Sequence, residues 1–191
     1  LEGAEDRTNS IDDVLTSEER KLVDTHLHEN CYTFWRYMQT FFHSGARSTE
    51  LFRVKESHIN MPNQRFKTLI MKGRKWVWVW RTIKDIALPL WDELLKECAV
   101  YRKASGQHST DPYIFSKGLQ PGVARINPDT ISRRWQRWVI ADQTKVINGR
   151  ERKTNGLGIK KRFYDIKHLH TTEIMDTLEG SVGIEQAEKA V

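Results

Sequence analysis

Hydrophobic side chains recur at helical spacing in the early part of the chain. Between residues 30 and 43 they include Tyr32, Phe34, Trp35, Met38 and Phe41. This spacing places them along one face of a helix, which we expect to be largely buried. An earlier helix is predicted to begin at Thr16 or Ser17, because a hydroxyl cap followed by Glu18 and Glu19 suits a helix N-terminus.

A different pattern follows the helix break predicted at Gly45. Residues 65–71 and 76–83 are rich in β-branched and aromatic side chains, and Lys-Gly-Arg-Lys at 72–75 separates them. Two such runs joined by a glycine-containing turn predict a β-hairpin. A short strand is expected near residues 57–59, so that the sheet has three strands.

The second half of the chain predicts further helices. One is expected over residues 90–101 after a proline, and another over residues 129–147. Residues 148–158 are polar and glycine-rich, which predicts a loop. Two more helices are predicted, over residues 165–178 and from about residue 183.

These elements indicate an α+β fold that is mostly helical, with a small antiparallel three-stranded sheet on one edge. The 191 residues suffice for one sizeable hydrophobic core. We therefore expect a single domain over residues 15–191. The polar segment 1–14, which lacks periodicity, is expected to be a disordered tail.

Composition narrows the class of protein only modestly. Lys and Arg outnumber Asp and Glu by 31 to 25, which gives a net charge of +6. This surplus permits a nucleic-acid partner without establishing one. Basic residues concentrate in three stretches, 67–84, 133–137 and 150–167.

Cysteine usage and hydropathy argue against three classes of protein: disulfide-framework, zinc-binding and membrane-spanning proteins. Cys31 and Cys98 fit no C-x-x-C pattern, so a disulfide framework or a zinc site is not predicted, and a reducing cytoplasm is the default. No apolar run approaches the roughly 20 residues of a membrane helix, and no signal peptide is recognised. Because the chain starts at Leu1, we expect it to be a fragment of a longer protein.

Three local motifs carry the chemical prediction. Arg47 and Glu50 lie three residues apart on one helical turn and, taken alone, would be a surface ion pair. Lys72 follows 25 residues later (72 − 47) at the predicted hairpin tip. A basic segment, Phe-Tyr-Asp-Ile-Lys-His-Leu-His at 163–170, places Lys167 a further 95 residues on (167 − 72).

In order and spacing these motifs resemble the catalytic domain of tyrosine recombinases, the phage-integrase family, over about Leu15 to Val191. The resemblance implies that Arg47 contacts the scissile phosphate, since a planar guanidinium can bind two phosphate oxygens. Glu50 would position neighbouring groups. Lys72 would protonate the departing 5′ oxygen as general acid, with Lys75 as the alternative.

The later motif departs from the family's His-x-x-Arg pattern. Tyr164 occupies the position of the family's histidine, and Lys167 occupies that of its second arginine; His168 is a supporting residue. Lysine cannot form the paired contact of a guanidinium. In the family a Gly-His pair and then the nucleophilic tyrosine follow this motif, so the nucleophile is expected beyond Val191.

The resemblance implies a site-specific DNA recombinase, the integrase of a prophage or other mobile element, that cleaves and rejoins DNA through a covalent phosphotyrosine. It implies duplex attachment or core sites as partner, a homotetramer on DNA for the full-length protein, no cofactor, and a bacterial cytoplasmic, nucleoid-associated location. The alternative is a catalytically inactive recombinase-like protein that only binds DNA. A third reading is a basic helical adaptor with coincidental motifs.

Several further basic residues are candidate DNA contacts: Lys75, Arg133, Arg134, Arg137, Lys160 and Lys161. The arginines at 133–137 are expected either to touch phosphates or to be solvated, above Trp135 and Trp138 in the core. Two His-x-His pairs at 26–28 and 168–170 would suggest a metal. Since residues two apart on a helix point to different faces, no metal site is predicted.

Three tryptophans alternate along the predicted second hairpin strand. Trp76, Trp78 and Trp80 would share one face, with Val77 and Val79 on the other. Stacking on nucleic-acid bases is one possible role of such a row. Packing in the core or at an interface is the favoured expectation.

Overall fold

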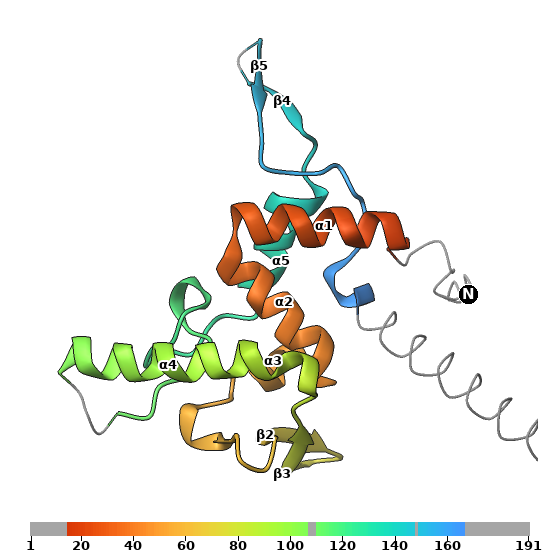
Figure 1. The fold of residues 1–191 in the computed structure, drawn as a ribbon. Helices are drawn as coiled ribbons and strands as arrows, with labels where there is room; N and C mark the ends of the chain where they lie inside the picture. The colour runs from red at the N-terminus through yellow and green to blue at the C-terminus, as the bar shows by residue number, and fades with distance from the viewer. Residues whose placement is uncertain (1–14, 107–109, 148, 167–191) are drawn as a thin grey trace, which may run out of the picture. The chain divides into compact units, whose positions relative to one another are not determined.

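The computed structural model describes residues 15–106, 110–147 and 149–166 (Figure 1). They belong to two compact units. The central unit spans Asp24–Arg134, and the terminal unit combines the residues up to Val23 with those from Trp135 onward. The predicted tail at 1–14 and the helices predicted after residue 166 lie outside the described residues.

Two consecutive helices open the fold, α1 (Ser17–Asn30) and α2 (Tyr32–Ser44). The N-cap of α1 is Thr16, whose hydroxyl accepts the Glu19 N–H at 3.2 Å while the Glu19 carboxylate accepts the Thr16 N–H at 2.9 Å. This reciprocal pair is a capping box. Of the two predicted caps, Thr16 and Ser17, the structure therefore selects Thr16.

The predicted aromatic helix is confirmed as α2. It buries Phe34, Tyr37, Met38, Phe41 and Phe42, whereas Tyr32 is 39% exposed. The helix ends at Gly45, whose φ of 63° is left-handed and therefore suits glycine. The predicted break at this residue is confirmed.

The predicted hairpin and the third strand are present as one antiparallel sheet in the order β1-β2-β3. Its strands are β1 (Ile59–Asn60), β2 (Arg65–Lys72) and β3 (Lys75–Thr82). The strand predicted at 57–59 is displaced, because a 3₁₀ turn, Glu56–His58, precedes β1. The four-residue helical turn α3 (Ser48–Leu51) comes before it.

The register of the hairpin gives the sheet two distinct faces. Phe66 and Thr68 of β2 lie on the buried face, opposite Arg81 and Val79 of β3. The other face carries Lys67 and Leu69 opposite Trp80 and Trp78. The predicted separation of tryptophans and valines onto opposite faces is therefore confirmed.

Helix α4 (Leu88–Ser105) is longer than the predicted 90–101. Pro89 lies in its first turn, where a missing N–H costs nothing. Trp91 is buried and its ring centroid lies 4.6 Å from that of Phe66, which joins the helix to the sheet. Cys98 is buried as well, and desolvation raises the pKa of its thiol to about 12.

The helix predicted over residues 129–147 is wrong in its second half. Helix α5 (Asp129–Trp135) continues as a π-helical turn, Gln136–Ile140, and then stops. The Val139 carbonyl accepts the N–H groups of Leu157 and Ile159, at 3.2 and 3.1 Å. A returning chain segment thus satisfies a carbonyl that would otherwise require continued helix.

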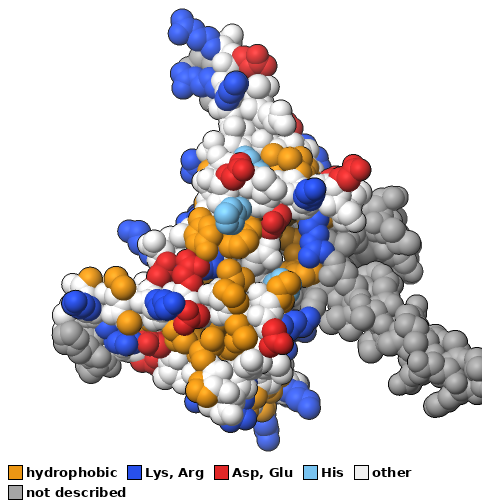
Figure 2. Space-filling model, in the orientation of Figure 1, with side chains coloured by type: hydrophobic (Ala, Val, Ile, Leu, Met, Phe, Trp, Pro, Cys, Tyr) orange, Lys and Arg blue, Asp and Glu red, His pale blue; other side chains and the backbone are white. Residues whose placement is uncertain are grey.

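The loop predicted at 148–158 is also wrong in part. Strands β4 (Thr144–Ile147) and β5 (Arg150–Lys153) form a separate two-stranded antiparallel sheet. The sequence between them is Asn148-Gly149, a pair that favours a tight hairpin turn. All four β5 residues are exposed, and basic side chains crowd this hairpin at the top of Figure 2.

The terminal unit packs around Trp135, which is buried as predicted. Its indole N–H donates to the Lys161 carbonyl at 2.7 Å, and its ring meets Phe163 edge-on at 5.4 Å. A 3₁₀ turn, Phe163–Asp165, follows. Across the described stretches of the chain, no helix is long and apolar enough to cross a membrane.

Candidate nucleic-acid interface

Arg47 stands at the N-cap of α3, with its side chain directed outward. The Glu50 carboxylate accepts the Arg47 backbone N–H at 3.1 Å, and the Arg47 backbone carbonyl accepts the Glu50 N–H at 2.9 Å. The Arg47 side chain is 67% exposed and its Nε lies 4.0 Å from Glu50, whose own side chain is 9% exposed. The buried acid therefore fixes the backbone of Arg47 and leaves its guanidinium accessible.

Glu50 also ties this turn to the sheet. Its carboxylate pairs with Arg81 of β3 at 2.7 Å, and its backbone carbonyl accepts the Thr68 hydroxyl at 2.9 Å. Thr68 is fully buried. The resemblance implies a positioning role for Glu50, but its partners Arg81 and Thr68 could not be predicted from the sequence because they lie 31 and 18 residues away.

Lys72 occupies the hairpin tip, as predicted. It is paired with Lys75 across the two-residue turn, in which Gly73 has a φ of 61°. Both lysines and Arg74 are exposed. No hydrogen bond or ion pair in the described part of the chain joins Lys72 to Arg47, so the two are linked only through α3 and the hairpin.

The outer face of the sheet corrects an expectation. Trp76, Trp78 and Trp80 of β3 are 50%, 51% and 51% exposed, so packing in the core of the chain is wrong for them, whereas packing at an interface stays a prediction. Their shared face of the sheet is thus about half open to solvent, with Met71 of β2 also 49% exposed. Figure 2 shows hydrophobic and basic side chains side by side at this β2–β3 end, the lower edge of the view.

A cation lies over each of these rings. The Arg53 guanidinium is 3.9 Å from the Trp76 centroid. Arg65 lies 4.4 Å from the Trp80 ring, and the Lys67 ammonium 5.4 Å from that of Trp78. Such cation–π contacts are attractive and leave the positive charge unneutralised.

Beside the tryptophans the surface is hollowed into a groove of about 500 Å³. It is lined by Arg53, Lys55, His58, Leu69, Trp76, Trp78, Asp111, Tyr113 and Arg125. The His58 ring meets Trp78 edge-on at 4.8 Å. Burial, and after it the positive charge of Lys67, lowers the pKa of His58.

Positively charged side chains outnumber negatively charged ones in the lining of this groove. Burial, and after it the charge of Arg125, lowers the pKa of Arg53. The Arg53 Nε atom is buried without a hydrogen-bond acceptor among the described residues. The single acid of the lining, Asp111, already accepts two hydrogen bonds from Ser57, at 2.9 and 2.8 Å, and lies 4.0 Å from Lys55.

The arginines predicted on α5 occupy mixed environments. Arg133 and Arg137 are exposed, and Arg137 lies 5.7 Å from the Trp138 ring centroid. Arg134 is half-buried and donates to the Cys31 sulfur at 3.6 Å. Two of the three therefore remain available to solvent.

The predicted lysines of the terminal unit have intramolecular contacts. Lys160 donates to the Ile140 carbonyl at 2.9 Å and pairs with Asp142 at 2.5 Å, so it stabilises the end of the π-helical turn. The carbonyl of Lys161 binds Trp135. Tyr164 is 47% exposed. Lys167 and His168 lie outside the described residues.

No metal site is found among the described residues, since no group of three His, Cys, Asp or Glu side chains is placed to hold an ion. His26 binds Asn30 within α1, and His28 packs against the ring of Trp35 at 4.5 Å. The other His-x-His pair, 168–170, lies outside the described residues.

Comparison with known proteins gives no match for this chain among protein families, curated proteins or solved structures. Its function must therefore be argued from its own residues.

Proposed function

We propose that the chain is the catalytic domain of a site-specific DNA recombinase that cleaves and rejoins duplex DNA. The proposal rests on the way in which the fold holds Arg47. Its guanidinium is exposed, while buried Glu50 fixes its backbone and joins it to the hairpin that bears Lys72. An accessible guanidinium on a fixed backbone position can meet the negative charge that develops on a phosphate under attack.

The chemistry assigns each group one role. A tyrosine oxygen attacks the phosphorus, and the bond from phosphorus to the 5′ oxygen breaks. Arg47 stabilises the negative charge on the non-bridging oxygens. Lys72 donates its proton to the departing 5′ oxygen. The phosphotyrosine bond formed in this step is then attacked by a 5′ hydroxyl, which rejoins the strand and releases the tyrosine.

A second candidate function is DNA binding without cleavage. It is favoured by Lys167, which stands where the resemblance calls for a second arginine. An ammonium provides one strong contact and not the paired contact of a guanidinium. Both candidates use the exposed cations around Arg47, and they differ in whether a covalent intermediate forms.

Covalent capture separates the two candidates. The full-length gene product is incubated with a library of random-sequence duplexes that carry nicks, and DNA attached to protein after denaturation is recovered. A recombinase yields attached DNA. Lys72→Ala should reduce the rate of capture about 10²–10⁴-fold, whereas Lys75→Ala, the neighbour across the turn, should change it little.

The role of Lys72 has a chemical control. A substrate with sulfur in place of the 5′ bridging oxygen has a leaving group that needs no proton, so it should restore capture by Lys72→Ala. Absence of capture by the unaltered protein would favour the DNA-binding candidate. Capture that survives Lys72→Ala but fails with Lys75→Ala would assign the acid to Lys75.

Lys167 offers a further test in the same assay. If it supplies the second cation, Lys167→Ala should lower the rate about 10²–10³-fold, and Lys167→Arg should be mild or beneficial. Robust capture by Lys167→Ala would instead point to a neighbour such as Arg162.

A further inference from the structure

The tryptophan face of the sheet and the groove beside it form a second surface, on the side of the hairpin opposite to Arg81 and α3. Three indoles at alternate positions of one edge strand are each about half exposed. Met71 and Leu69 lie across from Trp76 and Trp78 on β2 and extend this apolar surface. A contiguous exposed patch of large apolar side chains marks an interaction site.

The charge around this surface selects an anionic partner. Arg53, Arg65 and Lys67 lie over the rings, and Arg125 is close enough to Arg53 to lower its pKa. Within the described residues none of these four cations forms an ion pair with a carboxylate. A partner that carries both flat aromatic groups and negative charges can stack on the indoles and pair with the cations at the same time.

We propose that this surface binds unpaired nucleotides, as a site for single-stranded DNA. Bases stack on aromatic side chains while a positively charged groove follows the phosphates. The preference for DNA over RNA rests on the proposed function. The stacking site itself stands on the tryptophans, the cations and the groove, and is independent of strand cleavage.

The spacing of the indoles favours a single strand over a duplex. Alternate residues of a strand lie about 6.8 Å apart, twice the rise per residue. Bases in a duplex are stacked about 3.4 Å apart along each strand and expose only their edges in the grooves. Bases that contact successive tryptophans must therefore be separated from one another, as they are in an extended single strand.

The test measures binding of a fluorescently labelled ten-nucleotide oligothymidine to the 191-residue chain by anisotropy. Trp78→Leu should weaken binding about 5-fold or more, because loss of one stacked base contact has effects of this size. The triple variant Trp76→Leu, Trp78→Leu, Trp80→Leu should weaken it at least 100-fold. Trp78→Phe, which keeps an aromatic face, should retain most of the affinity.

Two controls make the result specific. Ile86→Ala, at an exposed apolar residue of the same unit, should leave binding unchanged, and circular dichroism should show that each variant is folded. Duplex affinity of the triple variant should stay within about twofold of the original. A failure of the recombinase proposal would appear as absent covalent capture and would leave these single-strand measurements as they are.

Three outcomes would overturn the proposal. The first is oligothymidine binding by the triple variant equal to that of the original chain. The second is an equal loss of single-stranded and duplex binding, which would make the face a backbone contact for duplex DNA. The third is tighter binding of oligouridine than of oligothymidine, which would replace DNA with RNA as the partner.

Discussion

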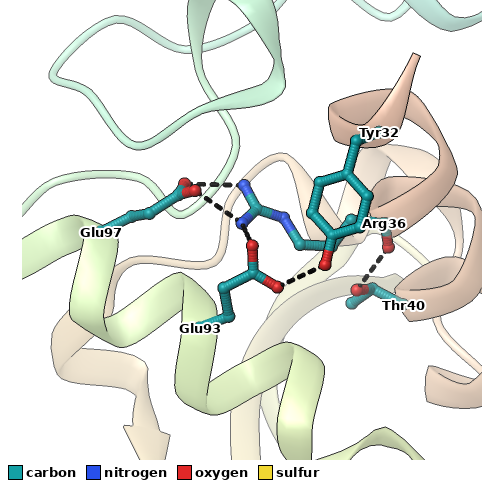
Figure 3. A network of polar contacts seen from close by, with 5 residues as sticks. All are labelled: Tyr32, Arg36, Thr40, Glu93 and Glu97. Carbon is teal, nitrogen blue, oxygen red and sulfur yellow. Dashed lines mark hydrogen bonds and ion pairs between the residues drawn. The ribbon is translucent and has the colours of Figure 1, made fainter. Parts of the chain in front are cut away.

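Two arginines of the central unit contrast sharply. Arg36 of α2 is fully buried and is bound by two acids of α4 (Figure 3): its Nη1 lies 2.7 Å from Glu93 and its two Nη atoms 2.7 Å from the Glu97 oxygens. Arg53 lies over Trp76 and beside Arg125, with no acid in contact in the described residues.

The pKa shifts of the two arginines have opposite signs. Burial lowers the pKa of Arg36, but the hydrogen bonds and charges of Glu97 and Glu93 raise it further than burial lowers it. For Arg53, burial and the charge of Arg125 both lower the pKa. The positive charge of Arg36 is neutralised within the fold, whereas Arg53 forms no ion pair with a carboxylate of the described residues and is influenced by Glu50 only at longer range. The comparison separates an arginine that joins two helices from one that contacts an aromatic ring without a paired acid.

Removal of Arg36 should have the largest effect on stability. Arg36→Met leaves two carboxylates without their cation, and loss of one partner of a buried pair costs about 3–5 kcal/mol. Because Glu93 and Glu97 are about one-third exposed, the lower end, about 3 kcal/mol, is expected. Urea unfolding followed by circular dichroism measures this loss.

A control and a double variant sharpen this prediction. Lys96→Met removes an exposed pair with Asp92 and should leave the urea midpoint unchanged. Arg36→Met with Glu97→Leu should recover part of the loss, since apolar replacement of a whole buried pair is well tolerated. An unaltered midpoint in Arg36→Met would show that the pair contributes nothing to stability.

Arg53 should behave in the opposite way. Arg53→Met removes a cation–π contact of about 0.5–1 kcal/mol and also the repulsion from Arg125, so stability should change by less than about 0.5 kcal/mol. Affinity for single-stranded DNA, measured by anisotropy with the same labelled oligothymidine, should nevertheless fall. A loss of stability as large as that of Arg36→Met, measured in the same urea experiment, would refute the distinction between the two arginines.

His58 should give the smallest effect, one that depends on pH. Its pKa is lowered in the folded state by burial and by Lys67, against the raising effect of Asp111. The unfolded chain therefore binds the proton more tightly, and stability falls as pH decreases through about 6.5 toward the lower native pKa. Protonation also abolishes the acceptor for the Lys55 N–H at 3.2 Å.

His58→Asn isolates this contribution. The asparagine oxygen can accept the same N–H but carries no titrating group. The difference in unfolding free energy between the variant and the original chain should grow in favour of the variant from pH 7.5 to pH 5.5. A difference that is constant over this range would remove His58 from the pH dependence.

Local patterns made much of the central unit predictable. The aromatic helix α2, the break at Gly45 and the β2–β3 hairpin all follow from residues close together in sequence. The placement of Arg47 on a turn and of Lys72 at the hairpin tip followed from the same signals. Gly45 and Gly73 both have a positive φ, which favours glycine, so the end of α2 and the hairpin turn could be predicted from the sequence.

Contacts between distant residues were not predictable. Arg36 lies 57 and 61 residues from its two acids, and the proximity of Arg125 to Arg53 likewise arises only in the folded chain. The exposure of the tryptophans could not be read from the sequence, because a row of large apolar side chains has the same composition on a buried face of a sheet as on an exposed one. The end of α5 was misplaced because the segment that terminates it returns from residues 157–159.

The central claim is that exposed cations of the central unit bind a nucleic acid. The salt dependence of duplex binding tests this claim most directly. Each neutralised phosphate releases counterions, so log affinity should fall linearly with log salt, by about 0.9 per phosphate contacted. Arg47→Ala should weaken binding and make the slope shallower by about one, while Lys96→Met should leave it unchanged. A nearly flat plot for the unaltered chain would contradict the account.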